Sequence, residues 1–346
     1  MATAWFIIIA LMLAAYVVFD GFDLGAGILH LFVAKTDEER RMVLRAIGPV
    51  WDGNEVWLIA AGGTLYFVFP LLYAVSFSGF YLPLMLVLWL LILRGISIEF
   101  RAHSQSPLWR SFWDGVFWLS SAMLAIVFGA ALGNVVRGVP IKPNGFFFEP
   151  FWTTFTVVPD SGILDWYTVL LGLVSLCSLA HHGANYLAVK TEGEVQARCR
   201  KFSAQSWWAV VILSLAAAWA TFSIHPGLLG KFGDYPLGIA LPLAGIMGLA
   251  GMYIYRSKSR DKAAFISSSI FIASMLAATA YGVYPALLPA STDSQYSITI
   301  YNAAADDYGL SVGMVWWSLG MILTIGYFIF IFRSFRGKVT TSGDGY

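Results

Sequence analysis

The sequence is poor in charged residues, in net charge and in cysteine, and each shortage excludes a class of protein. Charged residues make up 12% of the 346 residues, whereas an ordinary soluble domain has roughly 25%. The net charge of +1 excludes the strongly basic surface that a nucleic-acid partner requires. The two cysteines, Cys177 and Cys199, lie in an apolar run and in a basic loop, so they predict neither a disulfide framework nor a metal site.

Long apolar segments dominate what remains. Hydrophobic residues account for 58% of the chain, and the mean hydropathy is +0.71. A helix needs about 20 residues to cross about 30 Å of hydrocarbon. Nine segments meet this requirement: 4–32, 54–73, 77–98, 112–132, 164–187, 207–222, 237–255, 264–287 and 312–332. The sequence therefore predicts an all-α polytopic membrane protein with nine transmembrane helices, arranged as two four-helix bundles and one peripheral helix.

The loop charges predict how these helices are oriented. Nearly all Lys and Arg residues follow the first, third, fifth, seventh and ninth segments, whereas the opposite loops contain only Arg137, Lys142 and Lys231. Cytoplasmic loops carry the basic residues, so we expect the N-terminus outside and the C-terminus inside. The first segment has no basic residues before it and is expected to be a retained helix. Residues 1–338 should form one membrane domain, and 339–346 a polar tail.

Two carboxylates interrupt the first apolar segment. Asp20 and Asp23 lie three residues apart, which places them on nearly one face of a helix. Ionisable groups inside a span cost at least about 2.5 kcal/mol each and mark functional sites by default. Asp23 is therefore predicted to carry protons or support a cofactor. The neighbouring Gly21 and Gly25 are expected to permit close helix packing.

A second polar motif, Trp-Asp-Gly-Asn-Glu-Val-Trp, occupies residues 51–57 and includes Gly53. One interpretation is a helix start, because Asp52 and Asn54 are good N-cap residues and Glu55 stands three residues after Asp52, as in a capping box. Trp51 and Trp57 would then anchor the helix at the membrane interface. The other interpretation is a functional site, and composition alone does not decide between them.

A third polar group ends the third segment. Arg94 lies inside the span and needs a counter-charge, which either Glu99 or a first-segment aspartate can supply. The alternative is that Arg94 extends its side chain to the interface. The histidines offer no haem site, because His181 and His182 are adjacent and point about 100° apart on a helix. Hydrogen bonds between helices are their expected role.

These motifs resemble subunit II of the cytochrome bd oxidases. The resemblance rests on residues 20–25, on 48–57, which read Gly-Pro-Val-Trp-Asp-Gly-Asn-Glu-Val-Trp, and on 94–101. Residues 77–81 and 133–140 match in kind. The later half matches more by its layout than by motif. Some relatives have aspartate at Glu99 and glutamine at Glu55.

The resemblance implies a bacterial inner-membrane heterodimer. Its subunit I would carry two b haems, haem d and the quinol loop, and the complex would oxidise quinol and reduce dioxygen to water, drawing protons from the inside without pumping them. This chain would ligate no haem or other metal, although a quinone is possible. Its other partners would be membrane lipids, quinol and a small accessory membrane subunit.

The resemblance also suggests roles for individual residues. Asp23, Asp52 and Glu99 correspond by position to carboxylates of an inner-side proton path, with Asp20 and Arg94 beside it, and Trp57 corresponds to a tryptophan near the oxygen access route. Two alternatives remain open at this point. One is a secondary transporter or ion channel, which would also place charges in Gly-rich helices; the other is an assembly subunit without a proton role.

Overall fold

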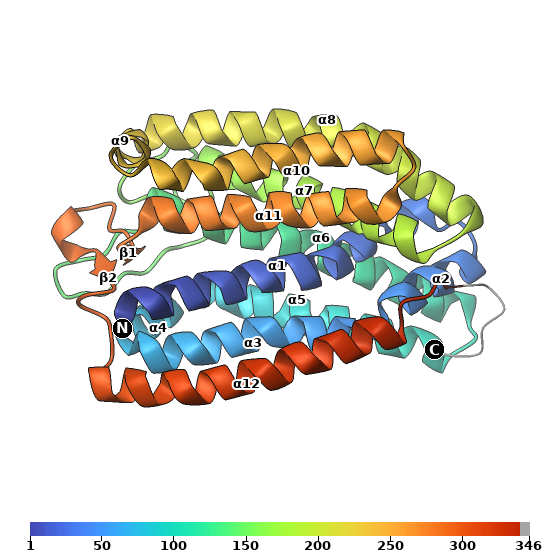
Figure 1. Ribbon diagram of the computed structural model, residues 1–346, viewed down its shortest axis with the longest axis horizontal. Helices are drawn as coiled ribbons and strands as arrows, with labels where there is room; N and C mark the ends of the chain where they lie inside the picture. The colour runs from blue at the N-terminus through green and yellow to red at the C-terminus, as the bar shows by residue number, and fades with distance from the viewer. Residues whose placement is uncertain (340–346) are drawn as a thin grey trace.

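The computed structural model describes residues 1–339, and helices form nearly all of it (Figure 1). The predicted tail lies outside these residues except for its first position. The α-helices are α1 (Ala2–Val33), α2 (Asp37–Ile47), α3 (Trp51–Val68), α4 (Pro70–Gly79), α5 (Tyr81–Phe100), α6 (Pro107–Arg137), α7 (Trp166–Lys190), α8 (Gly193–Ile224), α9 (Gly227–Asp234), α10 (Ala240–Ser257), α11 (Asp261–Val283) and α12 (Asp307–Ser334). Three short 3-10 helices, η1 (Arg101–His103), η2 (Pro236–Ile239) and η3 (Ser294–Tyr296), and two strands, β1 (Ala286–Leu288) and β2 (Ile298–Thr299), lie between them.

Eight of the described helices are long and apolar enough to cross a membrane, and the count reaches nine if the bent pair α3 and α4 is taken as one span. The polytopic all-α prediction is therefore confirmed. The second predicted span differs from the expected straight helix, because the chain bends by 119° between α3 and α4. Pro70 begins α4, where its missing N–H costs no hydrogen bond. Phe77 consequently belongs to α4, and the third span begins at Tyr81 instead.

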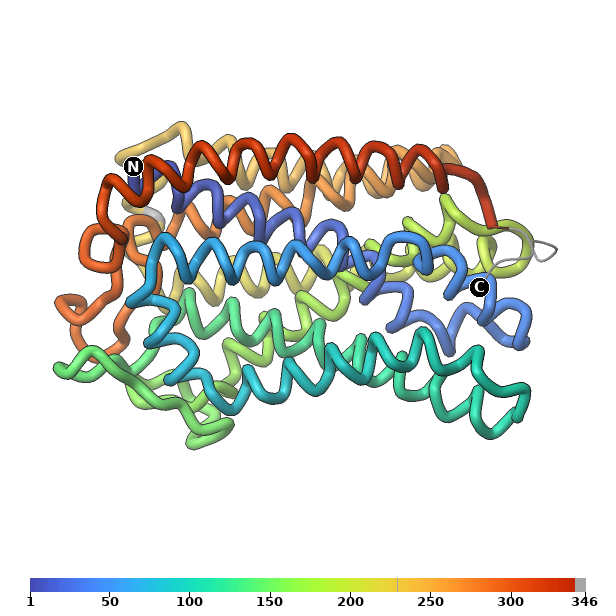
Figure 2. Tube along the Cα trace, turned by 90° about the horizontal axis from the view of Figure 1, so that it is seen from below, coloured from blue at the N-terminus to red at the C-terminus, as the bar shows by residue number. Residues whose placement is uncertain are grey.

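Two groups of four helices surround the interior. The helices α1, α3, α5 and α6 form the first group, and α7, α8, α10 and α11 form the second, with α1 packed against α7 and α11 across the boundary. Figures 1 and 2 show α12 running along the outside, beside α3. Among the residues of α12, only Leu310 is fully buried, as expected for a peripheral helix.

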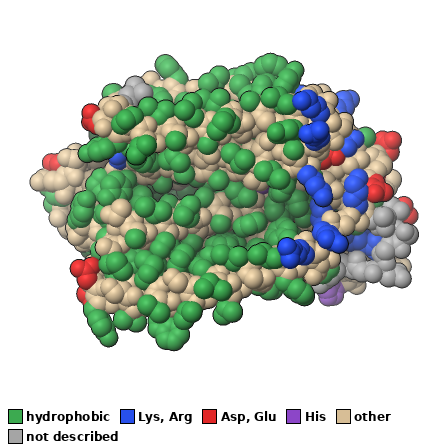
Figure 3. All heavy atoms as spheres, in the orientation of Figure 1, with side chains coloured by type: hydrophobic (Ala, Val, Ile, Leu, Met, Phe, Trp, Pro, Cys, Tyr) green, Lys and Arg blue, Asp and Glu red, His purple; other side chains and the backbone are tan. Residues whose placement is uncertain are grey.

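The two ends of the bundle differ in structure and charge. One end carries the start of α1, the short helix α9 and the β1–β2 hairpin, and the other carries α2 and the end of α12 (Figure 1). Lys and Arg side chains gather at the α2 end, while apolar side chains cover most of the length between the ends (Figure 3). We refer to these two ends as the basic end and the hairpin end. The predicted orientation would place the basic end inside the cell.

Candidate functional site

A buried ion pair joins α1 to α5. Asp20 and Arg94 are both 0% exposed. The Arg94 Nη1 donates to Asp20 Oδ2 at 2.7 Å, and Nη2 donates to Oδ1, so the pair is bidentate. Planar pairing of this kind is the strongest arrangement available to a guanidinium and a carboxylate. The first-segment aspartate is thus the counter-charge for Arg94. Glu99 does not fill that role, and the interface-seeking alternative for Arg94 is wrong.

A second buried carboxylate connects α1 to α3. Asp23 is 0% exposed, and its Oδ2 accepts a hydrogen bond of 2.7 Å from Asn54 Nδ2. Asp23 Oδ1 is buried and has no hydrogen-bond partner within residues 1–339. Unpaired polar atoms in a protein interior commonly bind water or protons, because leaving them unsatisfied is costly. Asp23 therefore has one oxygen held by Asn54 and one oxygen that accepts no hydrogen bond from any described residue.

Two further polar groups border this pair of carboxylates. Glu55 Oε2 lies 3.7 Å from Arg94 Nη2, and its side chain is 19% exposed. Tyr16 is buried, and its hydroxyl, which faces Asp20, makes no well-formed hydrogen bond to any described residue. We call the set of Tyr16, Asp20, Asp23, Glu55 and Arg94 the polar cluster. It combines a fixed ion pair with three groups that retain unused hydrogen-bonding capacity.

The remaining predicted carboxylates lie outside this buried set. Asp52 and Glu99 are both exposed, Asp52 in the first turn of α3 and Glu99 in the last turn of α5. These helix ends lie toward the basic end of the bundle (Figure 1). The capping interpretation of Asp52 is wrong, since α3 begins at Trp51, and Val50 is an N-cap that makes no side-chain cap bond. Asn54 instead points inward to Asp23. The second motif thus contributes an inward amide and an outward carboxylate.

The two tryptophans of that motif have different surroundings. Trp57 is 8% exposed, and its ring stacks on Phe19 with centroids 6.1 Å apart. Its Nε1 is buried and donates to no acceptor in the described part of the chain. Trp51 is half-buried and lies close to Gly95. Trp57 is therefore an interior residue and does not serve as an interfacial anchor.

Glycines set the distances between the helices that carry the cluster. A Cβ added at Gly25 would come within 2.1 Å of the Leu179 carbonyl oxygen and 2.7 Å of Gly183 Cα. At Gly21 it would meet the Leu179 side chain at 2.9 Å. Gly25 and Gly183 thus let the backbones of α1 and α7 touch. By contrast, a Cβ at Gly53 would meet Tyr327 only at an ordinary 3.6 Å.

The deep histidines connect helices by hydrogen bonds, as predicted from their positions in the sequence. His181 Nδ1 lies 2.9 Å from Ser206 Oγ. His182 uses both ring nitrogens, with Nδ1 2.7 Å from Ser268 Oγ and Nε2 3.0 Å from the Val18 carbonyl oxygen. Both nitrogens of His182 are therefore engaged within the protein.

Sequence reasoning missed an ionic hub centred on Asp114 of α6. Its Oδ1 lies 2.6 Å from His30 Nε2 and accepts from Arg101 Nε at 2.5 Å, while Oδ2 accepts from Arg40 Nη1 at 2.9 Å. Asp114 is 1% exposed. The hub ties α2 to α1, α6 and η1 at the basic end. An acid inside the predicted span 112–132 was the signal that should have identified it.

A second missed group lies at the hairpin end. Arg137 donates from Nη2 to Glu149 Oε1 at 2.8 Å and from Nη1 to Asp165. Asp165 is also the N-cap of α7. Burial raises the pKa of Glu149 to about 8; Arg137 opposes this rise and Asp165 adds to it. The resembling segment 133–140 contained Arg137, but no feature of the sequence predicted its partners.

Comparisons with known proteins agree with this architecture. The pattern of the family described as cytochrome bd terminal oxidase subunit II matches residues 1–335. The chain is 29% identical to cytochrome bd-I ubiquinol oxidase subunit 2 of Escherichia coli K12, over 97% of this chain and 94% of that protein. It is also 29% identical to cytochrome bd ubiquinol oxidase subunit 2 of Bacillus subtilis, over 97% and 96%.

A probable cytochrome oxidase subunit 2 of Haemophilus influenzae is 28% identical over 97% of this chain and 94% of its own length. Among solved structures, a chain of the bd oxidase from Geobacillus thermodenitrificans has the same fold. It matches with a TM-score of 0.76 at 17% identity, covering 96% of this chain and 98% of the other. The family match decides against the transporter alternative. This chain belongs to the cytochrome bd terminal oxidase subunit II family.

Proposed function

We propose that this chain is the subunit of a quinol:dioxygen oxidoreductase that supports proton access, with a haem-bearing subunit I as its partner in a bacterial inner membrane. Membership of the family supports the reaction and the complex. The haems of subunit I would supply the electron-transfer and oxygen chemistry. The haem ligands would belong to subunit I, and His182 would act between helices, since both of its ring nitrogens are engaged within this chain.

The observation that carries the proton role is the unpaired Asp23 Oδ1 inside the bundle. Reduction of dioxygen to water consumes protons, and these protons must cross an apolar region to reach the site of reduction. A buried carboxylate with a free oxygen can hold a proton, whereas a carboxylate saturated by an arginine, such as Asp20, is a fixed charge. Asp23 is accordingly the proton-carrying member, and the Asp20–Arg94 pair sets the field around it.

The proposed route starts at the basic end. Asp52 and Glu99 are exposed there and would collect protons from water. Glu55 stands three residues after Asp52 on α3, on the same side of the helix, and is partly exposed. It would connect the surface to the polar cluster, where Asn54 holds Asp23 in position. Water would complete the route at the unpaired oxygen atoms.

Trp57 has a separate proposed role in oxygen access. Its ring lies against Phe19 and Phe328, with centroids 6.1 and 5.7 Å away. Dioxygen is apolar, so it enters an aromatic, apolar environment more readily than water does. Trp57 and these two phenylalanines would form the apolar side of the route, next to the polar cluster that serves protons.

The test measures oxygen uptake by the purified complex with quinol as the electron donor. Asp23→Asn and Asp52→Asn should slow turnover while the reduced-minus-oxidised haem spectrum stays at full amplitude. Asp160→Asn is the control, because it removes an exposed carboxylate at the hairpin end. Wild-type turnover in both variants would contradict the proton role and leave assembly as the only role of this chain. Absence of co-purifying haem would contradict the oxidase assignment itself.

A further inference from the structure

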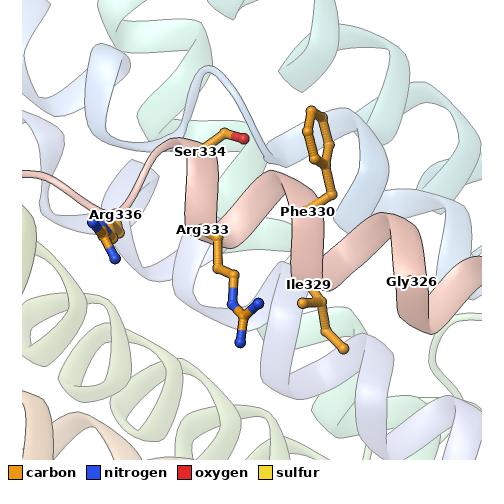
Figure 4. Close-up of a pocket in the computed structure, with 6 residues that line it drawn as sticks. All are labelled: Gly326, Ile329, Phe330, Arg333, Ser334 and Arg336. Atoms are coloured by element: carbon orange, nitrogen blue, oxygen red, sulfur yellow. The ribbon is translucent and has the colours of Figure 1, made fainter.

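An open groove lies beside the last turns of α12 at the basic end. Its volume is about 610 Å³. The residues that line it are Gly326, Ile329, Phe330, Arg333, Ser334 and Arg336. Figure 4 shows Arg333 and Ile329 on one side of α12, with the Arg336 guanidinium directed the same way just beyond the helix. The groove therefore has a cationic end and an apolar end.

The two arginines of the groove differ from most others at this end of the molecule. Arg40 and Arg101 pair with Asp114, Arg198 pairs with Glu39, and Arg200 pairs with Asp261. Within residues 1–339, Arg333 and Arg336 make no ion pair. Both are exposed, and neither guanidinium donates a hydrogen bond within the described residues, so their ten N–H groups can serve a ligand that supplies several oxygen acceptors.

The apolar end of the groove continues along the membrane-spanning surface. Ile329 is 49% exposed and Phe330 is 67% exposed, and Ile322 and Ile325 extend the apolar surface at 67% and 52%. A Cβ added at Gly326 would meet no atom within 4 Å. An extended hydrocarbon chain can therefore lie over Gly326 without displacing a side chain.

We propose that this groove binds an anionic phospholipid of the leaflet at the basic end. Its phosphate would accept hydrogen bonds from Arg333 and Arg336, and one acyl chain would lie along Gly326 and Ile329. Guanidinium groups suit phosphate oxygens because they donate in a planar fork. Inorganic phosphate shares this chemistry but would leave the apolar end of the groove uncovered, so the lipid is the occupant that fits both ends. The site is separate from the polar cluster and does not depend on its proton role.

The first test measures lipid binding to the purified, delipidated oxidase complex by native mass spectrometry. The added probes are phosphatidylglycerol, phosphatidylcholine and inorganic phosphate. Arg333→Gln with Arg336→Gln should weaken phosphatidylglycerol binding roughly thirtyfold, since each basic side chain near an anionic surface contributes about 1 kcal/mol. The control pair, Lys201→Gln with Lys258→Gln, removes the same charge from exposed positions outside the groove and should retain the binding.

The second test fills the groove without changing its charge. Gly326→Trp should abolish the same bound phosphatidylglycerol, whereas Gly320→Trp, at another position where a Cβ meets nothing within 4 Å, should keep it. Three results would overturn the proposal. They are equal binding of phosphatidylcholine, binding of inorganic phosphate that displaces the lipid, and release of subunit I from the arginine double variant with lipid binding intact.

Discussion

Asp20 and Arg94 meet in the interior of the protein as a bidentate ion pair, with both side chains 0% exposed. They come from α1 and α5 and lie 74 residues apart in the sequence. Transfer of either charge alone into an apolar interior is very costly, so each of these two side chains is tolerated there only when its partner is present. This relationship fixes the position of α5 against α1 and leaves Asp23 as the carboxylate with a free oxygen.

Removing one member of this pair should destabilise the protein more than removing both. Arg94→Gln or Asp20→Asn leaves an uncompensated buried charge, and we expect a loss of about 3–5 kcal/mol. The double variant should recover a large part of that loss. Thermal unfolding of the purified complex measures this, with exposed Lys258→Gln as the control. Equal losses in the single and double variants would show that the two charges are not coupled.

The contact between α1 and α7 should tolerate no side chain at Gly25. Gly25→Ala places a Cβ 2.1 Å from the Leu179 carbonyl oxygen, so the helices must separate, at a cost of about 1–3 kcal/mol. Gly62→Ala is the matched control, because a Cβ there meets nothing within 4 Å. Thermal unfolding should show a lower midpoint for Gly25→Ala only. A midpoint unchanged from the wild type would mean that the helices are not in backbone contact.

The Glu149 carboxyl group should make stability depend on pH. Burial raises its pKa from 4.5 to about 8, so the folded protein holds this proton more tightly than the unfolded chain. Its stabilising contribution is complete below about pH 4.5 and is lost as the pH rises to about 8. Glu149→Gln mimics the protonated form. Between pH 6 and pH 8, the thermal unfolding midpoint of this variant should therefore decrease less than that of the wild type. A series of thermal unfolding experiments over this pH range measures the difference. Parallel pH profiles for the two proteins would contradict this prediction.

The Asp114 hub should hold α2 against the bundle. Asp114→Asn removes the negative charge shared by Arg40 and Arg101, so α2 should open more often. Hydrogen exchange should rise at least tenfold in residues 37–47 and remain unchanged in α12, since local opening governs exchange. Asp37→Asn provides a comparison, because Asp37 is more exposed and also pairs with Arg101. A uniform rise over the whole chain would indicate global destabilisation instead.

The sequence was most informative where charged residues interrupt apolar segments, because a charge inside a membrane is energetically unfavourable. Asp20, Asp23 and Arg94 stood out because charges inside apolar segments demand compensation, and the structure brings all three into one cluster. It was less informative about partners. Glu99 stands only five residues from Arg94, yet it points outward, because the counter-charge comes from another helix.

Tertiary structure also decided what each polar motif does. Asn54 has good capping chemistry, but its amide turns inward to Asp23, because α3 packs against α1 at that level. The bend at Pro70 and the partners of Glu149 likewise depend on how helices and loops meet. Local spacing says nothing about these contacts.

The sequence by itself determined the apolar segments, the alternation of basic loops and the family. The first two depend on the composition along the chain, and the family depends on local motifs. Only the tertiary structure decided that Asp20 is neutralised while Asp23 keeps a free oxygen, and that Arg333 and Arg336 remain unpaired beside an open groove within residues 1–339. The physical reason is that a charge's state depends on which groups come within a few ångströms of it, and packing between distant segments sets that distance.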